Sequence, residues 1–362
     1  MRKERFKEHL VGLNRTRVGI HENPRSSLFL HRNERVIPYD DHTIRLLQER
    51  LSKLPVHYYP DLEVFYQKLA EWLSVGVNNL YVSEGVSGAI KSIIETIAGP
   101  GDNIVFPSPT FALYPVYSRM FDLECRSVGY TDDLKLDMDK FYKTIDGNTA
   151  IVFLPNPNIP IEGTLSVHDI SALAKHCSAK GSFLAMDEVY YGFGGPTAIG
   201  LMNQYDNIFI MRSFSKAFGL AGIRLGYVVG SEENVGYISK TRTGYETNAV
   251  SAEIASFFID NYAVVDNYIA SVKEGSAYLK AEFDAMGLEY SGGTASNFIF
   301  VRMTDPEIVR QLDIYMKSKN IHIRAGWPPP FDSGFCVTMG PRECMEAFIK
   351  ELKCFLNRKV MV

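Results

Sequence analysis

A lysine set among small hydroxyl-bearing and apolar residues carries the strongest chemical signal in this sequence. Lys216 lies in MRSFSKAFGLAGIRLGYVVG (211–230), after an apolar run typical of a buried strand, and Ser213 and Ser215 stand just before it. Most lysines are solvated at the protein surface. Apolar neighbours instead disfavour the ammonium form, which leaves a neutral amine able to attack an aldehyde. This pattern predicts that Lys216 is an amine nucleophile.

Two further charged residues gain meaning beside this lysine. Asp187 ends the apolar run SFLAMDE (182–188), and open α/β sheets place their ligand sites at the carboxyl ends of strands. Arg224 is a second cation in the same segment as Lys216. By itself the Asp-Glu pair would suit a metal ion or a helix cap, and a lone arginine would suit a surface ion pair. The presence of Lys216 favours a functional interpretation of both.

A candidate anion site lies upstream, in YVSEGVSGAIKSIIETIAGPGD (81–102). This segment predicts a strand, a glycine turn and an amphipathic helix that begins near Val86. The amides and the positive dipole end of a helix N-terminus bind anions, and Gly85 lets the backbone approach a ligand closely. Ser87 could equally serve as an ordinary helix-start residue.

These segments resemble the Schiff-base signature of class I and II aminotransferases, which depend on pyridoxal 5'-phosphate (PLP), and most closely that of histidinol-phosphate aminotransferase. The resemblance implies that Lys216 is catalytic and carries the cofactor as a Schiff base. Asp187 would keep the pyridine nitrogen protonated, so that the ring accepts electrons, and Tyr190 would bond the ring oxygen O3'. The residues that the resemblance places around the cofactor phosphate are Gly85, Val86, Ser87, Ser213, Ser215 and Arg224.

Two aromatic residues extend the resemblance. Phe111, in FPSPTFALYPVY (106–117), matches an aromatic that lies flat against the pyridine ring, although an ordinary core phenylalanine would also fit. Tyr59, in HYYPD (57–61), matches a tyrosine that reaches the cofactor phosphate of the neighbouring subunit, although a buried structural tyrosine is the alternative. Tyr59 therefore implies a homodimer.

The match fails at the asparagine that bonds O3'. The family motif is NPNNPTG, whereas this chain has NPNIPIEGT (156–164), with Ile159 at that position and an extra residue before Gly163. Either Asn158 takes the role or Tyr190 alone sets the environment of O3'. We favour Asn158.

The match also fails where the family binds the substrate. An arginine of the motif LRITxG is replaced by Cys336 in FCVTMG (335–340), whereas Arg324 matches the family's other small-domain arginine, if it is not simply an exposed charge. Losing one arginine of an anion site costs about 2–5 kcal/mol when its partner stays desolvated. A different substrate specificity is therefore expected.

Near the amino terminus, GIHENPRSSL (19–28) resembles the family's NENPxG segment, which folds over the active site. His21 and Asn23 are thus possible substrate contacts. A solvent-facing loop is the alternative for His21.

Periodicity predicts an α/β fold with a mainly parallel sheet in a large domain and a small α+β domain, consistent with PLP-dependent transferases of fold type I. We expect an N-terminal segment (1–40) that joins the small domain and the active site, a large PLP-binding domain (41–260) and a small domain (261–362). The predicted helices are 40–54, 61–75, 167–181 and 343–356, and the predicted strands are 103–107, 150–155, 182–188, 207–213, 297–302 and 321–324.

Composition excludes several classes of protein. The chain has 362 residues, a net charge of −4 and a pI near 6.1, so no overall field would attract nucleic acid or an anionic membrane. Its five cysteines are scattered and lack the spacing of a metal site. The basic amino terminus runs on without the apolar core of a signal peptide, and we expect a cytoplasmic location.

The resemblance implies ping-pong transamination from glutamate to a small phosphorylated ketone. Imidazole acetol phosphate and a ketone like dihydroxyacetone phosphate are equally compatible with the missing arginine. The alternative is a PLP-dependent decarboxylase of an O-phospho amino acid, which relatives of this fold carry out with the same lysine and aspartate. A regulatory effector domain is disfavoured, because no helix-turn-helix module or basic stripe is attached.

Overall fold

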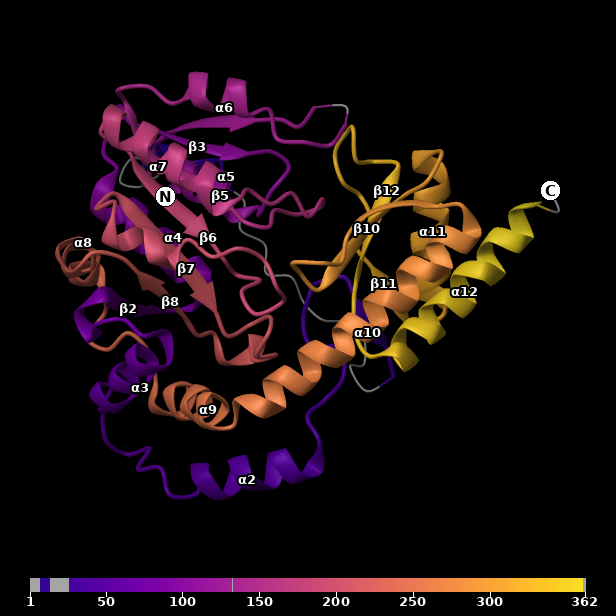
Figure 1. Ribbon diagram of the computed structural model, residues 1–362, viewed down its shortest axis with the longest axis horizontal. Helices are drawn as coiled ribbons and strands as arrows, with labels where there is room; N and C mark the ends of the chain where they lie inside the picture. Colours follow the sequence, from indigo (N-terminus) through magenta and orange to yellow (C-terminus); the bar gives the residue numbers. More distant parts are fainter. Residues whose placement is uncertain (1–6, 14–25, 132, 361–362) are drawn as a thin grey trace, which may run out of the picture.

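The centre of the molecule is a seven-stranded sheet, shown at the left of Figure 1. The computed structural model describes residues 7–13, 26–131 and 133–360. The strand order is β2-β8-β7-β6-β5-β3-β4, and β8 alone runs against its neighbours. The strands are β2 (Leu80–Ser83), β3 (Asn103–Pro107), β4 (Glu124–Val128), β5 (Thr149–Pro155), β6 (Phe183–Asp187), β7 (Ile208–Ser213) and β8 (Gly226–Val229).

Helices cover both faces of this sheet, which is why its strands read as continuous apolar runs. In β5, Val152 and Leu154 pack into one core, and the alternate residues Ile151 and Phe153 pack into the other. The helices that contribute to the two cores are α3 (Glu63–Leu73), α6 (Met138–Thr144), α7 (Val167–Lys180) and α9 (Ala249–Asp260) on one side, and α4 (Gly85–Ile97), α5 (Leu113–Met120) and α8 (Glu232–Ile238) on the other.

A second, smaller sheet lies at the right of Figure 1 and is built from the last part of the chain. Its antiparallel order is β12-β10-β9, and a short parallel pair, β1 with β11, joins it through a bridge between Arg324 and Cys336. The elements are β1 (Leu28–Leu30), β9 (Glu289–Gly292), β10 (Phe298–Arg302), β11 (Ile321–Ile323), β12 (Gly334–Thr338), α10 (Tyr262–Met286), α11 (Pro306–Ser318) and α12 (Arg342–Val360).

Two segments connect the two sheets. Helix α10 runs from beside α9 to the smaller sheet, where α12 lies along it (Figure 1). Residues 31–40 run from β1 in the smaller sheet to α2 (Asp41–Leu51), which packs near α9. On this path the Asn33 amide donates to Thr338 Oγ1 over 2.9 Å, and the Val36 amide donates to Tyr268 Oη over 3.0 Å. The segment is thus fixed to the smaller sheet and to α10.

The predicted fold class is confirmed, as are the predicted helices and strands, with ends shifted by a few residues. Caps explain several of these ends: Asp40 and Ser166 accept backbone N–H groups at the starts of α2 and α7, and Gly181 ends α7 in the left-handed conformation. The domain boundaries near residues 40 and 260 stay a prediction. The short helix α1 (Glu8–Val11) lies beside α5.

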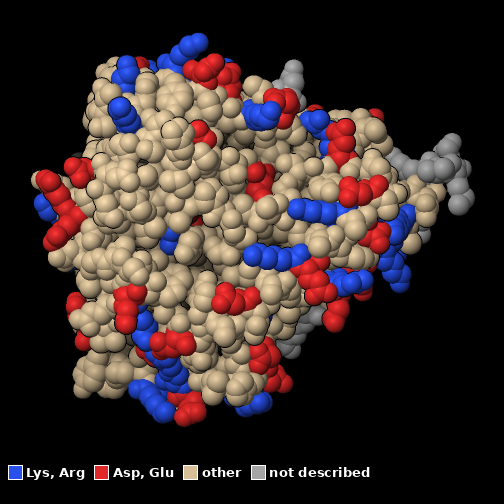
Figure 2. All heavy atoms as spheres, viewed as in Figure 1, with Lys and Arg blue, Asp and Glu red and all other residues tan. Residues whose placement is uncertain are grey.

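Charges of both signs alternate over the face seen in Figure 2, without a large patch of one sign. Among the described residues, no helix is long and apolar enough to cross a membrane. Nor does that part of the chain hold a cluster of three or more side chains suited to a metal ion.

Candidate active site

The predicted site residues gather at the carboxyl ends of β6 and β7 and in the hairpin from β7 to β8. Asp187 is the last residue of β6, and Ser213 is the last residue of β7. Gly226 begins β8 directly opposite Ser213, so Lys216 and Arg224 share one loop whose two ends are paired. Backbone pairing therefore fixes the base of this loop.

Lys216 is partly buried in this loop, and its Nζ donates to the carbonyl oxygen of Arg32 over 2.7 Å. Burial lowers the pKa of Lys216 to about 8, opposed by the carboxylate of Glu34 and assisted by the guanidinium of Arg224. A substantial fraction of the amine is therefore neutral near physiological pH, as the sequence predicts for a nucleophile.

Asp187 is 3% exposed. It accepts a hydrogen bond from Tyr114 Oη over 2.7 Å and another from the Val189 amide over 3.1 Å. Burial raises the pKa of Asp187 to about 6, because these two hydrogen bonds only partly replace the lost water. A cation placed against this carboxylate would restore its charged form.

Tyr190 lies close to Asp187 and faces the segment that connects the two sheets. Asn33 Nδ2 donates to Tyr190 Oη over 2.7 Å, which leaves the phenolic hydrogen free to donate elsewhere. Burial raises the pKa of Tyr190 well above its usual value, so the phenol stays protonated.

An anion cradle lies between the start of α4 and Arg224. Gly85 has φ 64°, and a Cβ added there would lie 3.0 Å from Arg224 Nη2. A Cβ added to Gly226 would lie 2.7 Å from Gly85 Cα. Arg224 itself adopts the left-handed conformation (φ 54°), which is unfavourable for a side chain and marks a constrained position. Close backbone approach therefore brings the guanidinium to the start of α4.

The donors of this cradle are available to a ligand. Glu84, the residue before α4, makes no side-chain cap hydrogen bond to the described residues, so the first-turn amides at Val86 and Ser87 have no side-chain acceptor. The hydroxyl of Ser213 accepts from the Ser215 amide over 3.0 Å, and the two hydroxyls are 2.9 Å apart. These groups could hold a phosphate.

Phe111 is 38% exposed, and its ring meets Tyr114 edge-on with centroids 6.0 Å apart. Tyr114 in turn holds Asp187, so Phe111 lies near the carboxylate rather than in the core. This exposure argues against an ordinary core phenylalanine.

Asn158 is buried, and its amide is fully engaged. Its Nδ2 donates to the Pro109 carbonyl over 2.9 Å and to Tyr130 Oη, while its Oδ1 accepts from Thr110 Oγ1 over 2.7 Å. To bond a cofactor oxygen, this amide would have to exchange one of these partners. Its predicted cofactor contact stays a prediction.

The smaller sheet brings Cys336 and Arg324 to the other side of the site. Cys336 is 1% exposed, and its Sγ lies 3.7 Å from the Pro160 carbonyl oxygen. Burial raises the pKa of its thiol well above the usual value, which makes Cys336 a neutral group. Arg324 is exposed, with its guanidinium 5.2 Å from the centroid of the Trp327 ring. Cys336 and Trp327 are thus buried and uncharged, and we call these two residues the uncharged wall. Arg324 is the exposed cation next to Trp327.

Tyr59 lies apart from these groups, and two further predicted residues fall outside the residues that the structure describes. Tyr59 is 81% exposed and stacks on Tyr245 with ring centroids 4.8 Å apart, which excludes a buried structural role within one subunit. His21 and Asn23 lie outside the described residues, and their substrate contacts stay predictions.

Sequence reasoning missed four contributors: Arg32, Asn33, Glu34 and Tyr114. An Asn-Glu pair like that of the family's NENPxG segment occurs at Asn33-Glu34, whereas residues 21–24 read HENP. Asn33 contacts Tyr190, and the carbonyl of the preceding Arg32 contacts Lys216. Tyr114 had no comparable signal, because its role depends on packing against β6.

Together these groups fit PLP. A buried amine with a lowered pKa suits its aldehyde, an anion cradle of glycine, free amides and arginine suits its phosphate, and a buried carboxylate suits its ring nitrogen.

Comparison with known proteins leads to the same conclusion. The family model "Aminotransferase class I and II" matches residues 37–352. A histidinol-phosphate aminotransferase from Thermoanaerobacter pseudethanolicus is 30% identical over 283 residues, which cover 77% of this chain and 79% of the relative. One from Thermotoga sp. strain RQ2 is 28% identical over 336 residues, covering 91% and 94%.

Solved structures share the fold. The histidinol-phosphate aminotransferase from Sinorhizobium meliloti in complex with pyridoxal-5'-phosphate gives a TM-score of 0.87 at 18% identity, covering 98% of both chains. The L-threonine-O-3-phosphate decarboxylase from Porphyromonas gingivalis gives 0.77 at 23% identity, covering 91% of this chain and 99% of that one. The matched length, the fold and the composition of the site show that this chain belongs to the class I and II aminotransferases and is a PLP-dependent aminotransferase.

Proposed function

We propose that this aminotransferase takes an amino group from glutamate and passes it to a small phosphorylated ketone that lacks an α-carboxylate, in a ping-pong cycle. The observation that carries the proposal is the buried, neutral Cys336 at the position of the family's substrate arginine. A thiol cannot neutralise a carboxylate, and a buried unpaired charge beside it would be costly. Arg324 remains as the cation for the donor's carboxylate or the acceptor's phosphate.

The chain's own residues divide the chemistry between them. Bound PLP supplies an electron sink for the bonds at the substrate's amino-bearing carbon. Lys216 Nζ would anchor the cofactor and, once freed, would move the proton at that carbon. Asp187 would hold the ring nitrogen as a cation, Tyr190 would donate its phenolic hydrogen to O3', and Phe111 would cover the ring. The cradle of Gly85, Val86, Ser87, Ser213, Ser215 and Arg224 would hold the phosphate.

Two acceptors remain candidates. Relatives named histidinol-phosphate aminotransferase support imidazole acetol phosphate, whereas the loss of the arginine is equally compatible with a ketone like dihydroxyacetone phosphate. A decarboxylase of an O-phospho amino acid is the competing function. Its substrate carries an α-carboxylate, as glutamate does, so the missing arginine does not separate the two functions, whereas release of CO2 does.

The working enzyme is a homodimer in this proposal. A hollow of about 450 Å³ is lined by Arg224 and by Tyr245, the ring on which Tyr59 stacks. In the dimer Tyr59 of one subunit reaches the cofactor phosphate of the other. Tyr59→Ala should weaken PLP binding and subunit association together, as measured by absorbance titration and sedimentation. If the wild-type protein is monomeric and Tyr59→Ala still weakens PLP binding, Tyr59 acts within its own subunit and the assignment is wrong.

The test of the function is spectroscopic. Purified protein is loaded with PLP, and glutamate should convert the visible absorbance of the bound cofactor to that of its amine form. Adding each phosphorylated ketone in turn should restore the visible band, as should 2-oxoglutarate, the keto form of the donor, whereas other 2-oxo acids without phosphate should restore it poorly. Release of CO2 from an O-phospho amino acid, with glutamate inactive, would instead select the decarboxylase.

A further inference from the structure

The loop that departs from the family motif contains an acidic residue, Glu162, that reaches across to the smaller sheet. This loop (156–164) follows β5 at the cofactor edge of the large sheet. The Glu162 carboxylate accepts from the Thr294 amide over 2.9 Å and from Ser296 Oγ over 2.6 Å, and it also accepts from the Ala295 amide. One side chain thus binds three successive residues of the β9–β10 connection.

The opposing backbone is shaped for this contact. A Cβ added to Gly292 (φ 99°) would lie 3.1 Å from Glu162 Cβ, so the strand end can approach this closely only as glycine. The next residue, Gly293, is held from the other side, because its carbonyl accepts from Ser276 Oγ over 2.7 Å and from Lys280 Nζ over 3.1 Å. The connection is therefore fixed between α10 and Glu162.

Hydrogen bonds and the peptide link from Ser296 to Asn297 connect this contact to the site. Asn297, next to Ser296, donates from Nδ2 to the Asn33 carbonyl over 3.1 Å. Asn33 donates to Tyr190 Oη over 2.7 Å. Strand β10 also pairs with β12, where Phe300 lies opposite Cys336. The position of β10 therefore sets where the uncharged wall stands relative to the cofactor.

We propose that Glu162 is a positioning residue that holds the smaller sheet, and with it the wall at Cys336, in the substrate-binding arrangement. The cofactor groups Lys216, Asp187 and Arg224 lie on the large sheet or in its hairpin, and none of them contacts Glu162 directly, so the proposal expects PLP binding to change much less than donor binding. The inserted residue has thus changed the role of a loop that in the family contacts O3'. The inference rests on the proposed function only in one respect, the choice of glutamate as the amino donor in the kinetic test.

The expected kinetic effect follows from a shift in population. Without the carboxylate, a smaller fraction of molecules holds the wall in place, and the apparent dissociation constant for an amino donor rises by the inverse of that fraction. Losing hydrogen bonds to a charged acceptor should raise it about tenfold or more. The rate at saturating donor should change much less, because bound donor restores the arrangement.

The experiment compares Glu162→Ala, Glu162→Gln and the control Glu289→Gln, an exposed acid on β9. Hydrogen exchange of the Thr294 and Ala295 amides measures the contact directly. We expect exchange about tenfold faster or more in Glu162→Ala, intermediate in Glu162→Gln and unchanged in the control. The PLP dissociation constant should stay within about threefold of wild type, since the cofactor groups are untouched.

The half-reaction is then measured against glutamate concentration. A raised apparent dissociation constant for glutamate with nearly unchanged PLP affinity supports the proposal. Unchanged exchange in Glu162→Ala, or PLP affinity that falls as much as glutamate affinity, overturns it. If glutamate leaves even the wild-type spectrum unchanged, the proposed donor is wrong, and the exchange and PLP measurements still decide on Glu162.

Discussion

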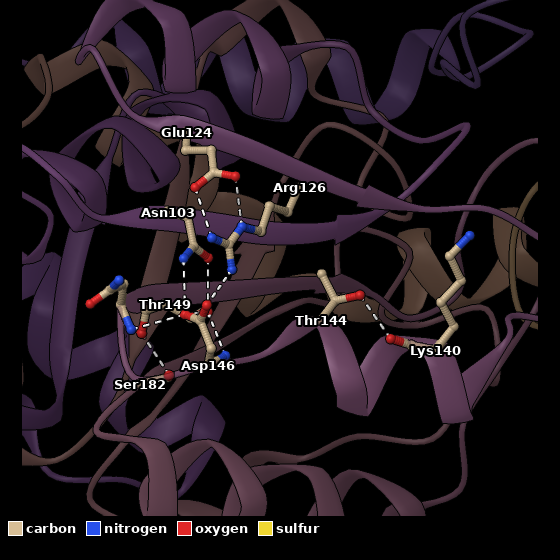
Figure 3. A network of polar contacts seen from close by, with 9 residues as sticks. Asn103, Glu124, Arg126, Lys140, Thr144, Asp146, Thr149 and Ser182 are labelled. Carbon is tan, nitrogen blue, oxygen red and sulfur yellow. Dashed lines mark hydrogen bonds and ion pairs between the residues drawn. The ribbon is translucent and has the colours of Figure 1, made fainter.

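At the amino ends of β3 and β5, polar side chains satisfy one another, as Figure 3 shows, whereas beyond the carboxyl ends of β6 and β7 the charged forms of Asp187 and Lys216 are only partly stabilised by their partners. Asn103 Nδ2 donates to Asp146 Oδ1 over 3.1 Å, and Thr149 Oγ1 donates to Asn103 Oδ1 over 2.8 Å. Arg126 donates to Asp146 Oδ2 over 2.5 Å, which holds the pKa of that carboxyl well below its usual range. Here the fold stabilises the charged forms.

Near the carboxyl ends, Asp187 and Lys216 are under the opposite condition, unlike the buried ion pair of Glu188 and Arg212 beside them. Burial raises the pKa of Asp187 to about 6 and lowers that of Lys216 to about 8, so the fold disfavours both charges. The difference teaches that one end of the sheet uses polar residues for stability and the other keeps them for a ligand that completes their interactions.

Replacing the nucleophile should have the largest effect. In Lys216→Met, loss of the anchor and of proton transfer should lower the rate by at least about 10²–10⁴-fold. The cofactor-free protein should not melt at a lower temperature, because a methionine of similar volume removes a buried amine. Absorbance with PLP and thermal unfolding measure the two effects. Retained activity would exclude Lys216 as the nucleophile.

Asp187→Asn should change stability in opposite directions with and without cofactor. The folded-state pKa of about 6 lies above the usual 3.8, so above pH 6 the ionised carboxylate destabilises the cofactor-free fold. The variant should therefore be the more stable protein at pH 8 without PLP, and this advantage should shrink as the pH falls below 6.

With PLP present, the same variant should be the less stable protein. Its PLP affinity should fall about a hundredfold or more, since breaking a buried ion pair costs about 3–5 kcal/mol. Calorimetry of both forms at pH 5 and pH 8 checks this. An equal loss of stability in both forms would remove the distinction between the two ends of the sheet.

At the amino ends, Asn103→Ala should affect stability alone. The change removes the acceptor that Thr149 Oγ1 uses at 2.8 Å and one donor to Asp146 Oδ1, which should lower the free energy of unfolding by about 1–3 kcal/mol. Denaturant unfolding gives this value. The half-reaction rate and the visible spectrum of the folded variant should match wild type, and a changed spectrum would show that the two ends are coupled.

The smallest expected effect is a lowered pH midpoint for the covalent binding of PLP by Lys216. With a folded-state pKa of about 8 rather than 10.5, the neutral fraction of Lys216 rises through pH 8. The rate at which added PLP becomes covalently bound should rise with pH and level off about one unit above that midpoint. Stopped-flow absorbance, compared with a free alkylamine under the same conditions, isolates the protein's contribution. A midpoint near 10.5 would mean that the amine is solvated.

The sequence predicted the parts of the site that carry local signals. Asp187 ends a strand, Gly85 begins a helix, and Lys216 and Arg224 lie in the short loop between two strands, where composition and spacing are informative. Asn33 and Tyr114 could not be found in this way, because their roles arise from partners far along the chain, such as the 157 positions between Asn33 and Tyr190. The Asn33-Glu34 pair was visible, but nothing local favoured it over HENP (21–24), which was matched to the family motif instead.

The same limit applies to Glu162. The extra residue before Gly163 was visible as a departure from the family motif, but its partners lie in a connection more than a hundred positions later. Only the packing of the two sheets shows what it binds.

The pairing of β1 with β11 also determines when the molecule can become competent during its synthesis. Leu28 lies opposite Ile321, so the strand that leads into Arg32 and Asn33 finds its neighbour only after nearly the whole chain has left the ribosome. Contacts between such distant positions form late, because the intervening chain must first be ordered. A nascent or truncated chain that ends before β11 would complete its large sheet without closing its catalytic centre.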